Sequence, residues 1–369
     1  MKLSERLLYA RQRAGLTGAH VKERTGIGES SLSEFETGKR EPSLSQLHAL
    51  ATAYRRSVAF FLEEGEIPRE VVLWRERPVQ GSEDVEALFL RRCQQYHNLE
   101  MWCDERLPAR LPYVPAAAGK FGVSDAKALA KEIRDHLQLG DRPGQSLLRI
   151  LEEVCAVKVF HLAFEPSGTA ASTRSESFGP AILLNSSNAR WRRNFDLAHE
   201  LFHLLTWELF RHAGEAVSTV AGEQEERLAD VFASHVLMPE EVLRITVEQY
   251  RDDKDSLPVD AVFTIARQFD VSVEALMWQI HSAFRIADPE WTKRRIASVK
   301  SFAPLFEKRE QQAPPPWPDR YEALAVQAYR RGELSIGRFA EYVGISRQEA
   351  MRMVEQEVTD DEEVPLALA

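Results

Sequence analysis

The sequence predicts a mainly α-helical chain with a small β-sheet, an α+β fold. Apolar residues recur at helical spacing over most of the 369 residues. Two short runs, CAVKVFHLAF (155–164) and PAILLN (180–185), have instead the apolar and β-branched content of strands. With 44% hydrophobic residues, a chain of this length can bury more than one core. We therefore expect several domains.

Breaks in these patterns divide the chain into five segments. Proline-rich stretches and changes of charge mark the boundaries. The segments are a five-helix N-terminal domain (1–66), a helical connector and linker (67–120), a larger domain of helices around the small sheet (121–310), a C-terminal helical segment (320–358) and an acidic tail (359–369) that is expected to be disordered.

Composition excludes several classes of protein. The three cysteines are widely spaced, and no two of them form a CxxC motif. This pattern predicts neither a disulfide framework nor a thiolate zinc site. No stretch approaches the roughly 18 consecutive apolar residues of a membrane span, so we expect a cytoplasmic protein without membrane contact. A net charge of -10 argues against a chain that coats nucleic acid along its length. Any DNA contact must be confined to one domain.

The N-terminal domain has the pattern of a helix-turn-helix. Thr17 is placed to cap a second helix that ends at Gly26, and the short TGIG turn leads directly into a third. The stretch SSLSEFETGKREPSLSQLHALATAY (30–54) resembles the Xre/Cro family of DNA-binding domains. This resemblance covers about 62 residues. It implies DNA binding, and a repressor-like domain of this kind commonly acts as a homodimer on paired half-sites.

Particular residues of this domain are candidates for DNA contact, and others oppose it. The candidates are Lys22, Lys39 and Arg40 for phosphates, and Ser30, Ser31 and Ser33 for bases. Glu29 and Glu34 repel phosphate, and Gly18 stands where such domains commonly carry glutamine. Residues 1–64 hold ten Lys and Arg against eight Asp and Glu, a small excess of +2. The alternative is a module kept for protein docking or dimerisation.

The connector contains one long predicted helix. Ser82 is placed to cap a helix that reaches Leu107, which we interpret as a spacer or a dimer strut. From about residue 121, two helical patterns precede the first strand. The stretch SGTAASTRSESFG (167–179) is predicted to be a turn region, and PAILLN to be the second strand. We expect PAILLN to form the edge of a cleft and to pair with an extended substrate.

The decisive motif is DLAHELFHLL (196–205). On a helix, His199 and His203 lie only about 40° apart on one face, so their imidazoles can converge on one ion. Two imidazoles at this spacing hold Zn²⁺, while Glu200 between them reaches a bound water and acts as general base. The alternative is a pair of histidines on a buried helix.

A third zinc ligand is expected on a later helix, within GEQEERLADVFASHVLMP (222–239). The pair Glu226 and Asp230 resembles the gluzincin arrangement, in which the glutamate binds zinc and the aspartate accepts the outer N–H of a ligating histidine. Glu223 and Glu225 are rival ligands, and the acidic run is alternatively a solvated helix start. Spacing to Asp230 and packing against small alanines favour Glu226.

These motifs together resemble the ImmA/IrrE family of metallopeptidases, over about residues 121–290. The resemblance implies a gluzincin-like zinc peptidase domain with His199, His203 and Glu226 as ligands and Glu200 as base. Phe202 departs from the family, which commonly has glycine there, and its ring is expected to narrow the cleft. The residue that stabilises the oxyanion is left open among Arg174, His212 and His235.

Two functions from different classes follow. The first is a zinc endopeptidase that cleaves a repressor or another regulatory protein, with the N-terminal domain binding DNA or that substrate. The second is a transcription regulator or antitoxin-like protein whose peptidase domain senses a partner with little turnover. Residues 320–358 imitate another helix-turn-helix, with Gly344 at the turn and Ser346 as the next cap, and we interpret them as a docking element.

Overall fold

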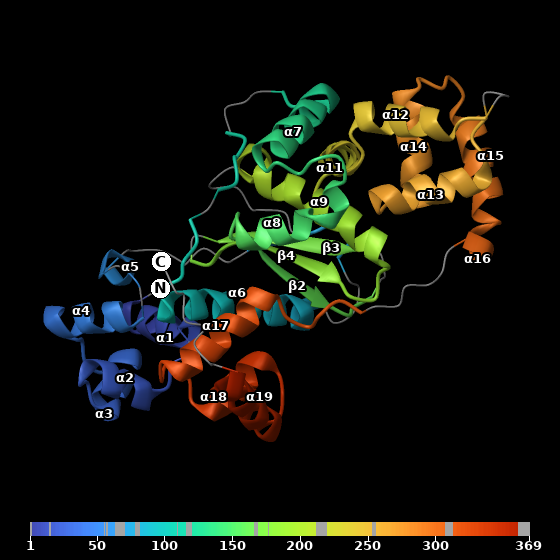
Figure 1. The fold of residues 1–369 in the computed structure, drawn as a ribbon. Helices are drawn as coiled ribbons and strands as arrows, with labels where there is room; N and C mark the ends of the chain where they lie inside the picture. The colour runs from blue at the N-terminus through green and yellow to red at the C-terminus, as the bar shows by residue number, and fades with distance from the viewer. Residues whose placement is uncertain are drawn as a thin grey trace, which may run out of the picture. The chain divides into compact units, whose positions relative to one another are not determined.

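A computed structural model shows a mostly helical chain with one four-stranded mixed sheet, which confirms the predicted fold class (Figure 1). The structure describes residues 2–14, 16–54, 56, 58–62, 71–77, 82–108, 110–115, 120–165, 169–175, 177–211, 220–252, 256–306 and 313–360. Within these ranges, none of the helices combines the length and hydropathy needed to cross a bilayer. The chain divides into two compact units. The first comprises Met1–Glu70, Leu90–Arg106 and Ala323–Ala369, and the second Val71–Phe89 and Leu107–Glu322.

The first unit begins with the predicted five-helix domain. Its helices are α1 (Leu3–Arg13), α2 (Gly18–Thr25), α3 (Glu29–Glu36), α4 (Leu44–Ala53) and α5 (Val58–Leu62). Leu7, Val21 and Leu50 are fully buried in its core. The Thr17 side chain accepts a hydrogen bond from the His20 amide and begins α2, and Gly26 ends that helix with a φ of 73°. A helix-turn-helix arrangement of α2 and α3 results.

The same unit contains the later part of α6 (Ser82–Trp102), from the connector, and the C-terminal helices. The latter are most of α17 (Asp319–Arg330), α18 (Ile336–Val343) and α19 (Arg347–Asp360). Ser335 caps α18, Gly344 ends it with a φ of 71°, and the Ser346 hydroxyl accepts from the Glu349 amide. Helix α6 is shorter than predicted and ends at Trp102. Helix α19 extends to Asp360, into the predicted tail, whose residues 361–369 lie outside the described ranges.

The second unit is built on the sheet. Its strands are β1 (Val72–Trp74), β2 (Lys158–Leu162), β3 (Ala170–Ser175) and β4 (Gly179–Asn185). Their order is β1-β3-β4-β2; β2 is parallel to β4, and the other two pairs are antiparallel. In the register, Leu73 of β1 lies opposite Ser172 of β3, and Ile182 of β4 lies opposite Val159 of β2.

Three sequence-based expectations about this sheet are wrong. The stretch predicted as a turn region contains β3, whose small Ala, Ser and Thr side chains gave no apolar strand pattern but allow helix α9 to pack closely on it. The segment predicted as a connector supplies β1. PAILLN, in β4, is an interior strand whose backbone pairs with β3 and β2, so it cannot be the cleft edge that pairs with substrate.

The other helices of this unit include those that carry the residues of interest. They are α7 (Val123–His136), α8 (Leu147–Glu153), α9 (Arg190–Leu205), α10 (Trp207–Phe210), α11 (Glu223–Leu237), α12 (Glu240–Tyr250), α13 (Val259–Phe269), α14 (Val273–Ala283), α15 (Pro289–Lys300) and α16 (Ala303–Phe306), with a short 3-10 turn at Pro143–Gln145. Helix α9 packs on β3 and β4, and α11 packs on α9 and α7.

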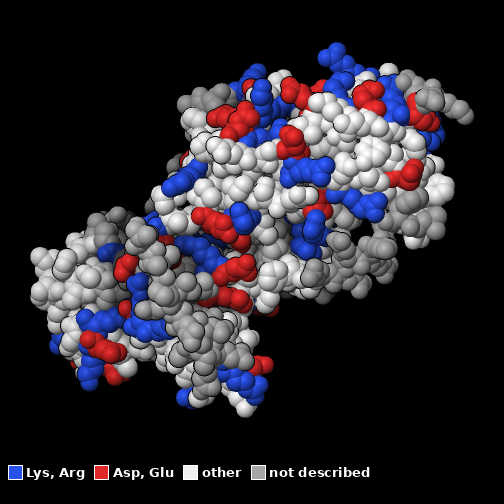
Figure 2. All heavy atoms as spheres, in the orientation of Figure 1, with Lys and Arg blue, Asp and Glu red and all other residues white. Residues whose placement is uncertain are grey.

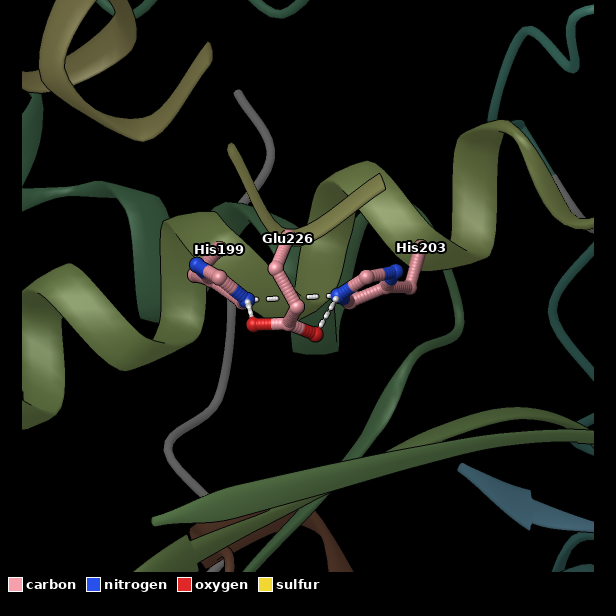
Figure 3. A group of neighbouring side chains, drawn as sticks. All are labelled: His199, His203 and Glu226. Atoms are coloured by element: carbon pink, nitrogen blue, oxygen red, sulfur yellow. Dashed lines mark hydrogen bonds and ion pairs between the residues drawn. The ribbon is translucent and has the colours of Figure 1, made fainter. Parts of the chain in front are cut away.

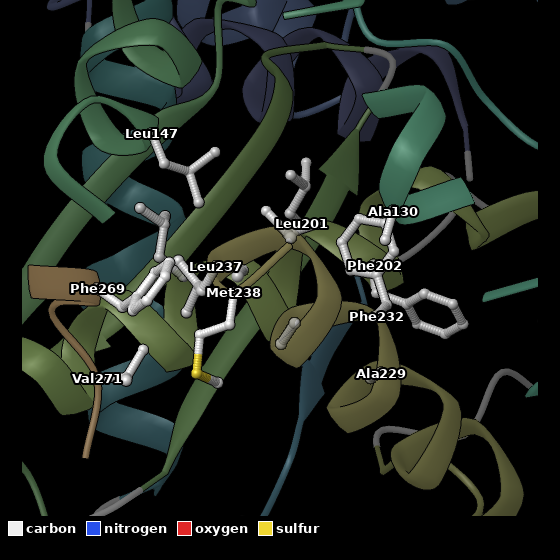
Figure 4. Close-up of a cluster of buried hydrophobic side chains, with 14 of the residues drawn as sticks. Ala130, Leu147, Leu201, Phe202, Ala229, Phe232, Leu237, Met238, Phe269 and Val271 are labelled. Atoms are coloured by element: carbon white, nitrogen blue, oxygen red, sulfur yellow. The ribbon is translucent and has the colours of Figure 1, made fainter. Parts of the chain in front are cut away.

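The core of this unit lies where α9, α11 and α7 meet (Figure 4). Phe202 is fully buried there, with ring centroids 5.5 Å from Phe232 and 6.1 Å from Phe121. The ring therefore packs in the core rather than narrowing a cleft, which corrects the expectation for this departure from the family pattern. Such packing fixes the position of α9 relative to α11.

Candidate metal centre

Helices α9 and α11 bring together three side chains that could bind a metal ion (Figure 3). The Nε2 atoms of His199 and His203 lie 3.2 Å apart, and the carboxylate of Glu226 faces both. One oxygen of Glu226 is 3.1 Å from His199 Nε2, and the other is 3.4 Å from His203 Nε2. Among the residues that the structure describes, this is a group able to hold a metal ion, with its donor atoms all within 4.8 Å of one another.

The spacing of these donor atoms suits a tetrahedral ion. Donors about 2.0 to 2.1 Å from Zn²⁺ lie about 3.3 Å from one another in a tetrahedral site. The two Nε2 atoms are 3.2 Å apart, and each has a Glu226 oxygen at a similar distance, Oε2 at 3.1 Å from His199 and Oε1 at 3.4 Å from His203. Two imidazoles and one carboxylate are also a common donor set of zinc sites that keep a fourth position open. The residues present therefore fit zinc.

Asp230 orients one of the two imidazoles. It lies one turn after Glu226 on α11, and its Oδ1 is 2.9 Å from Nδ1 of His199. A carboxylate in this position accepts the Nδ1 proton and leaves Nε2 free as a donor to a metal. Sequence spacing had paired Asp230 with a histidine, without deciding which.

Glu225 orients the other imidazole. Its Oε1 is 2.8 Å from Nδ1 of His203 and 2.7 Å from Nη2 of Arg211. The sequence analysis treated Glu225 only as a rival ligand, because neighbouring helix residues differ by about 100° and the pattern did not show which would face the ion. Glu223, the other rival, is exposed in the first turn of α11.

Glu200 is a buried carboxyl group on α9, between the two histidines in sequence. It is fully buried, and neither carboxylate oxygen has a hydrogen-bond partner. Burial raises the pKa of Glu200, and the nearby His203 and His199 oppose that rise. The Ser172 hydroxyl on β3 also opposes it, although the pair does not reach hydrogen-bonding geometry. A carboxyl group with a raised pKa is suited to exchange protons with a reacting group.

The pKa of the Glu226 carboxylate shifts in the opposite direction. Burial alone would raise the pKa of Glu226, but its close ion-pair contacts with His199 and His203 lower it to about 2. Burial alone would lower the pKa of His203, whereas its bonds to Glu225 and Glu226 raise it to about 9. The site thus holds Glu226 ionised, as a metal ligand must be.

Known proteins match both parts of this chain. The family described as the IrrE N-terminal-like domain matches residues 152–280, and a helix-turn-helix domain family matches residues 2–59. Residues 152–280 are thus similar to an IrrE N-terminal-like domain, and residues 2–59 to a helix-turn-helix domain. A relative, the HTH-type transcriptional regulator ImmR of Bacillus subtilis (strain 168), is 34% identical over 70 residues, which is 19% of this chain and 55% of the relative. The chain thus spans about half the length of that curated relative.

Within the IrrE-like domain, the oxyanion candidates make other contacts. Arg174 forms an ion pair of 3.0 Å with Glu208, and its guanidinium lies over the ring of Tyr113. His235 Nδ1 is 2.8 Å from the carbonyl oxygen of Val231 one turn earlier on α11. His212 lies outside the described residues. None of the described contacts of Arg174 or His235 is with the three donor residues.

The helix-turn-helix domain exposes its candidate DNA contacts. Exposed side chains are those of Lys22, Ser30, Ser33, Lys39 and Arg40, whereas Ser31 is half-buried. Arg40 is 3.4 Å from Glu34, and its guanidinium lies over the ring of Phe35. A Cβ added at Gly18 would lie 3.2 Å from a carboxylate oxygen of Glu29, so these two departures from the Xre pattern adjoin each other. On the face drawn in Figure 2, basic and acidic side chains alternate over the described part of this domain.

Proposed function

We propose that the protein is a zinc-dependent endopeptidase of the ImmA/IrrE type that cleaves a repressor or another regulatory protein. The observation that supports this most is the convergence of His199, His203 and Glu226. The carboxyl group of Glu200, without a hydrogen-bond partner, lies on α9 between the two histidines. The match of residues 152–280 to the IrrE N-terminal-like domain supports the same conclusion. The proposed class of substrate, a regulatory protein, rests on the family resemblance alone.

The proposed chemistry divides between the metal and the side chains. When bound, zinc would polarise the peptide carbonyl and lower the pKa of water. His199, His203 and Glu226 would hold it, while Asp230 and Glu225 keep both imidazoles turned with Nε2 toward it. Glu200 takes the proton of the attacking water and delivers it to the leaving amine. Its burial suits it to both roles, because a raised pKa makes proton uptake and release comparably easy.

Metal removal tests this function directly. Chelator-treated protein should lose cleavage of its substrate, because no Lewis acid remains, and stoichiometric zinc should restore it. The measurement is gel analysis of the proteins encoded beside this chain, incubated with treated, zinc-restored and untreated enzyme. Cleavage that survives chelation would contradict a zinc peptidase. Absence of cleavage in every condition would favour the second function, a regulator whose IrrE-like domain senses a partner.

We also propose that the helix-turn-helix domain binds DNA for transcriptional control. The match of residues 2–59 and the similarity to ImmR, described as a transcriptional regulator, support this. Phosphate contacts would come from Lys22, Lys39 and Arg40, whose side chains are exposed, and base contacts from Ser30, Ser31 and Ser33. The small positive excess of the domain predicts a modest salt dependence.

A gel shift with the chain's own upstream region tests this role. Lys39→Ala is expected to weaken binding several-fold and to reduce the slope of log affinity against log salt by about one, because one phosphate contact is lost. Lys293→Ala, an exposed lysine on α15 paired with Glu290, serves as control and should change neither value. Failure to observe any salt-dependent band would exclude DNA binding to that region.

A further inference from the structure

Each of the two candidate metal-binding imidazoles is backed by a carboxylate, and each carboxylate by an arginine. Behind His203, Glu225 accepts from the imidazole at 2.8 Å and from Arg211 at 2.7 Å. Behind His199, Asp230 accepts from the imidazole at 2.9 Å and from Nη2 of Arg75 at 3.0 Å. The proposed metal site therefore has two separate series of hydrogen bonds, each linking an imidazole, a carboxylate and a guanidinium group.

The hydrogen-bonded pair behind His203, Glu225 and Arg211, is almost completely buried. The side chains of Glu225 and Arg211 are each only 7% exposed, and the guanidinium of Arg211 also lies over the ring of Trp207. In such surroundings a carboxylate depends on its protein partners, because water cannot replace a lost hydrogen bond. Without Arg211, Glu225 would be a buried charge with one partner fewer and more freedom to rotate away from His203.

The hydrogen-bonded pair behind His199, Asp230 and Arg75, is more exposed to solvent, but the backbone of Arg75 is attached to the sheet. Arg75 follows β1, and its backbone amide donates to the Ala170 carbonyl on β3. The Asp230 side chain is 46% exposed, and that of Arg75 is 21% exposed. The guanidinium also faces two further carboxylates, with Nη1 3.7 Å from Asp196 and Nε 3.8 Å from Glu226. Water can solvate Asp230 if Arg75 is lost.

Strand β1, which precedes Arg75, is held to the second unit by buried side chains. All three of its residues are buried, the Trp74 indole donates to Glu86 at 2.7 Å, and the Trp74 ring meets Phe164 edge to face. Detaching the strand would expose these buried apolar side chains to water, which is unfavourable. Arg75 contacts the site from a segment that lies outside residues 152–280, the range that matches the IrrE-like family.

We propose that Arg211 and Arg75 are positioning residues of the metal centre, and that Arg211 has the greater effect. Each holds a carboxylate that fixes the tautomer and the orientation of one imidazole, so that Nε2 faces the ion. The order follows from burial, because Glu225, the partner of Arg211, is only 7% exposed, whereas Asp230, the partner of Arg75, is 46% exposed. This inference rests on the proposed zinc site.

The test measures zinc affinity of the full-length chain by competition with a chromophoric chelator. Loss of the carboxylate to which a ligating histidine donates costs about 10- to 100-fold in metal affinity, and loss of the arginine behind that carboxylate should cost no more than this. We expect Arg211→Met to lie near the upper end of that range and Arg75→Met near the lower end. Arg244→Met is the matched control, since Arg244 also pairs with a glutamate and lies over a phenylalanine ring but is on α12. Its zinc affinity should equal that of the wild type.

Two further measurements separate positioning from a general loss of structure. The visible absorption of the Co²⁺-substituted protein reports ligand geometry and should shift in Arg211→Met but not in Arg244→Met. Arg211→Lys, which keeps the charge, should recover part of the affinity. If Arg211→Met does not fold, Glu225→Gln removes the same charge-assisted bonds and should show the same weakening.

The possible outcomes distinguish this inference from the proposed function. A wild type that binds no zinc would remove the proposed metal site itself. A wild type that binds zinc, with Arg211→Met and Arg75→Met binding equally tightly and with unchanged Co²⁺ spectra, would overturn the positioning role alone. A larger loss in Arg75→Met than in Arg211→Met would overturn the ranking by burial.

Discussion

Glu200→Gln is expected to lower the rate of substrate cleavage by about 10²- to 10⁴-fold, the usual contribution of a general acid–base group. Glutamine has nearly the same shape, so the packing of this fully buried side chain on α9 is retained. It cannot accept the proton of the attacking water or return it to the leaving amine. The measurement is a time course of cleavage for both proteins, each loaded with zinc.

Zinc content decides how that result is interpreted. Because Glu200 makes no hydrogen bond to the three donor residues, the variant should bind zinc as the wild type does. Glu241→Gln, an exposed glutamate at the start of α12, is the control and should cleave at the wild-type rate. If Glu200→Gln binds zinc and cleaves as fast as the wild type, Glu200 is not the base. If neither protein cleaves any candidate substrate, the sensing function is favoured.

The helix carrying the two histidines could be predicted because its information is local. Spacing of four residues on a helix is enough to place His199 and His203 on one face, and the apolar residues around them indicate burial. Thr17 and Gly26 were equally predictable as helix boundaries, since caps depend on adjacent backbone. These features require no knowledge of which distant segments meet.

The missed features depend on contacts between distant segments. Strand β1 has only three residues, and its role is set by pairing with β3, far along the chain. Arg75 therefore had no local signal as a site residue. Strand β3 was missed because its alanines, serine and threonine are selected for close packing under α9 rather than for apolar strand character. Burial on both sides, rather than hydropathy, defines it.

At the acidic start of α11, the role of each glutamate depends both on local helix geometry and on contact with a distant segment. Helical geometry separates Glu223, Glu225 and Glu226 by angle, but only the position of α9 decides which face meets the histidines. Packing of Phe202 against Phe232 fixes that position. Glu226 then faces both Nε2 atoms, and Glu225 reaches Nδ1 of His203. Adjacent glutamates thus receive different proposed roles, ligand and orienting residue.

Glu226→Ala is accordingly expected to abolish stoichiometric zinc binding, whereas Glu223→Ala should leave it intact. Removing one of three protein donors should cost more than the 10- to 100-fold that loss of an outer partner costs, because the ion loses a bond and its charge neutralisation. Both residues are glutamates in the first turn of α11, so helix propensity and the helix dipole change alike. The measurement is zinc per chain by atomic emission after gel filtration. Full occupancy in Glu226→Ala would mean that another carboxylate, with Glu225 the nearest in sequence, completes the site.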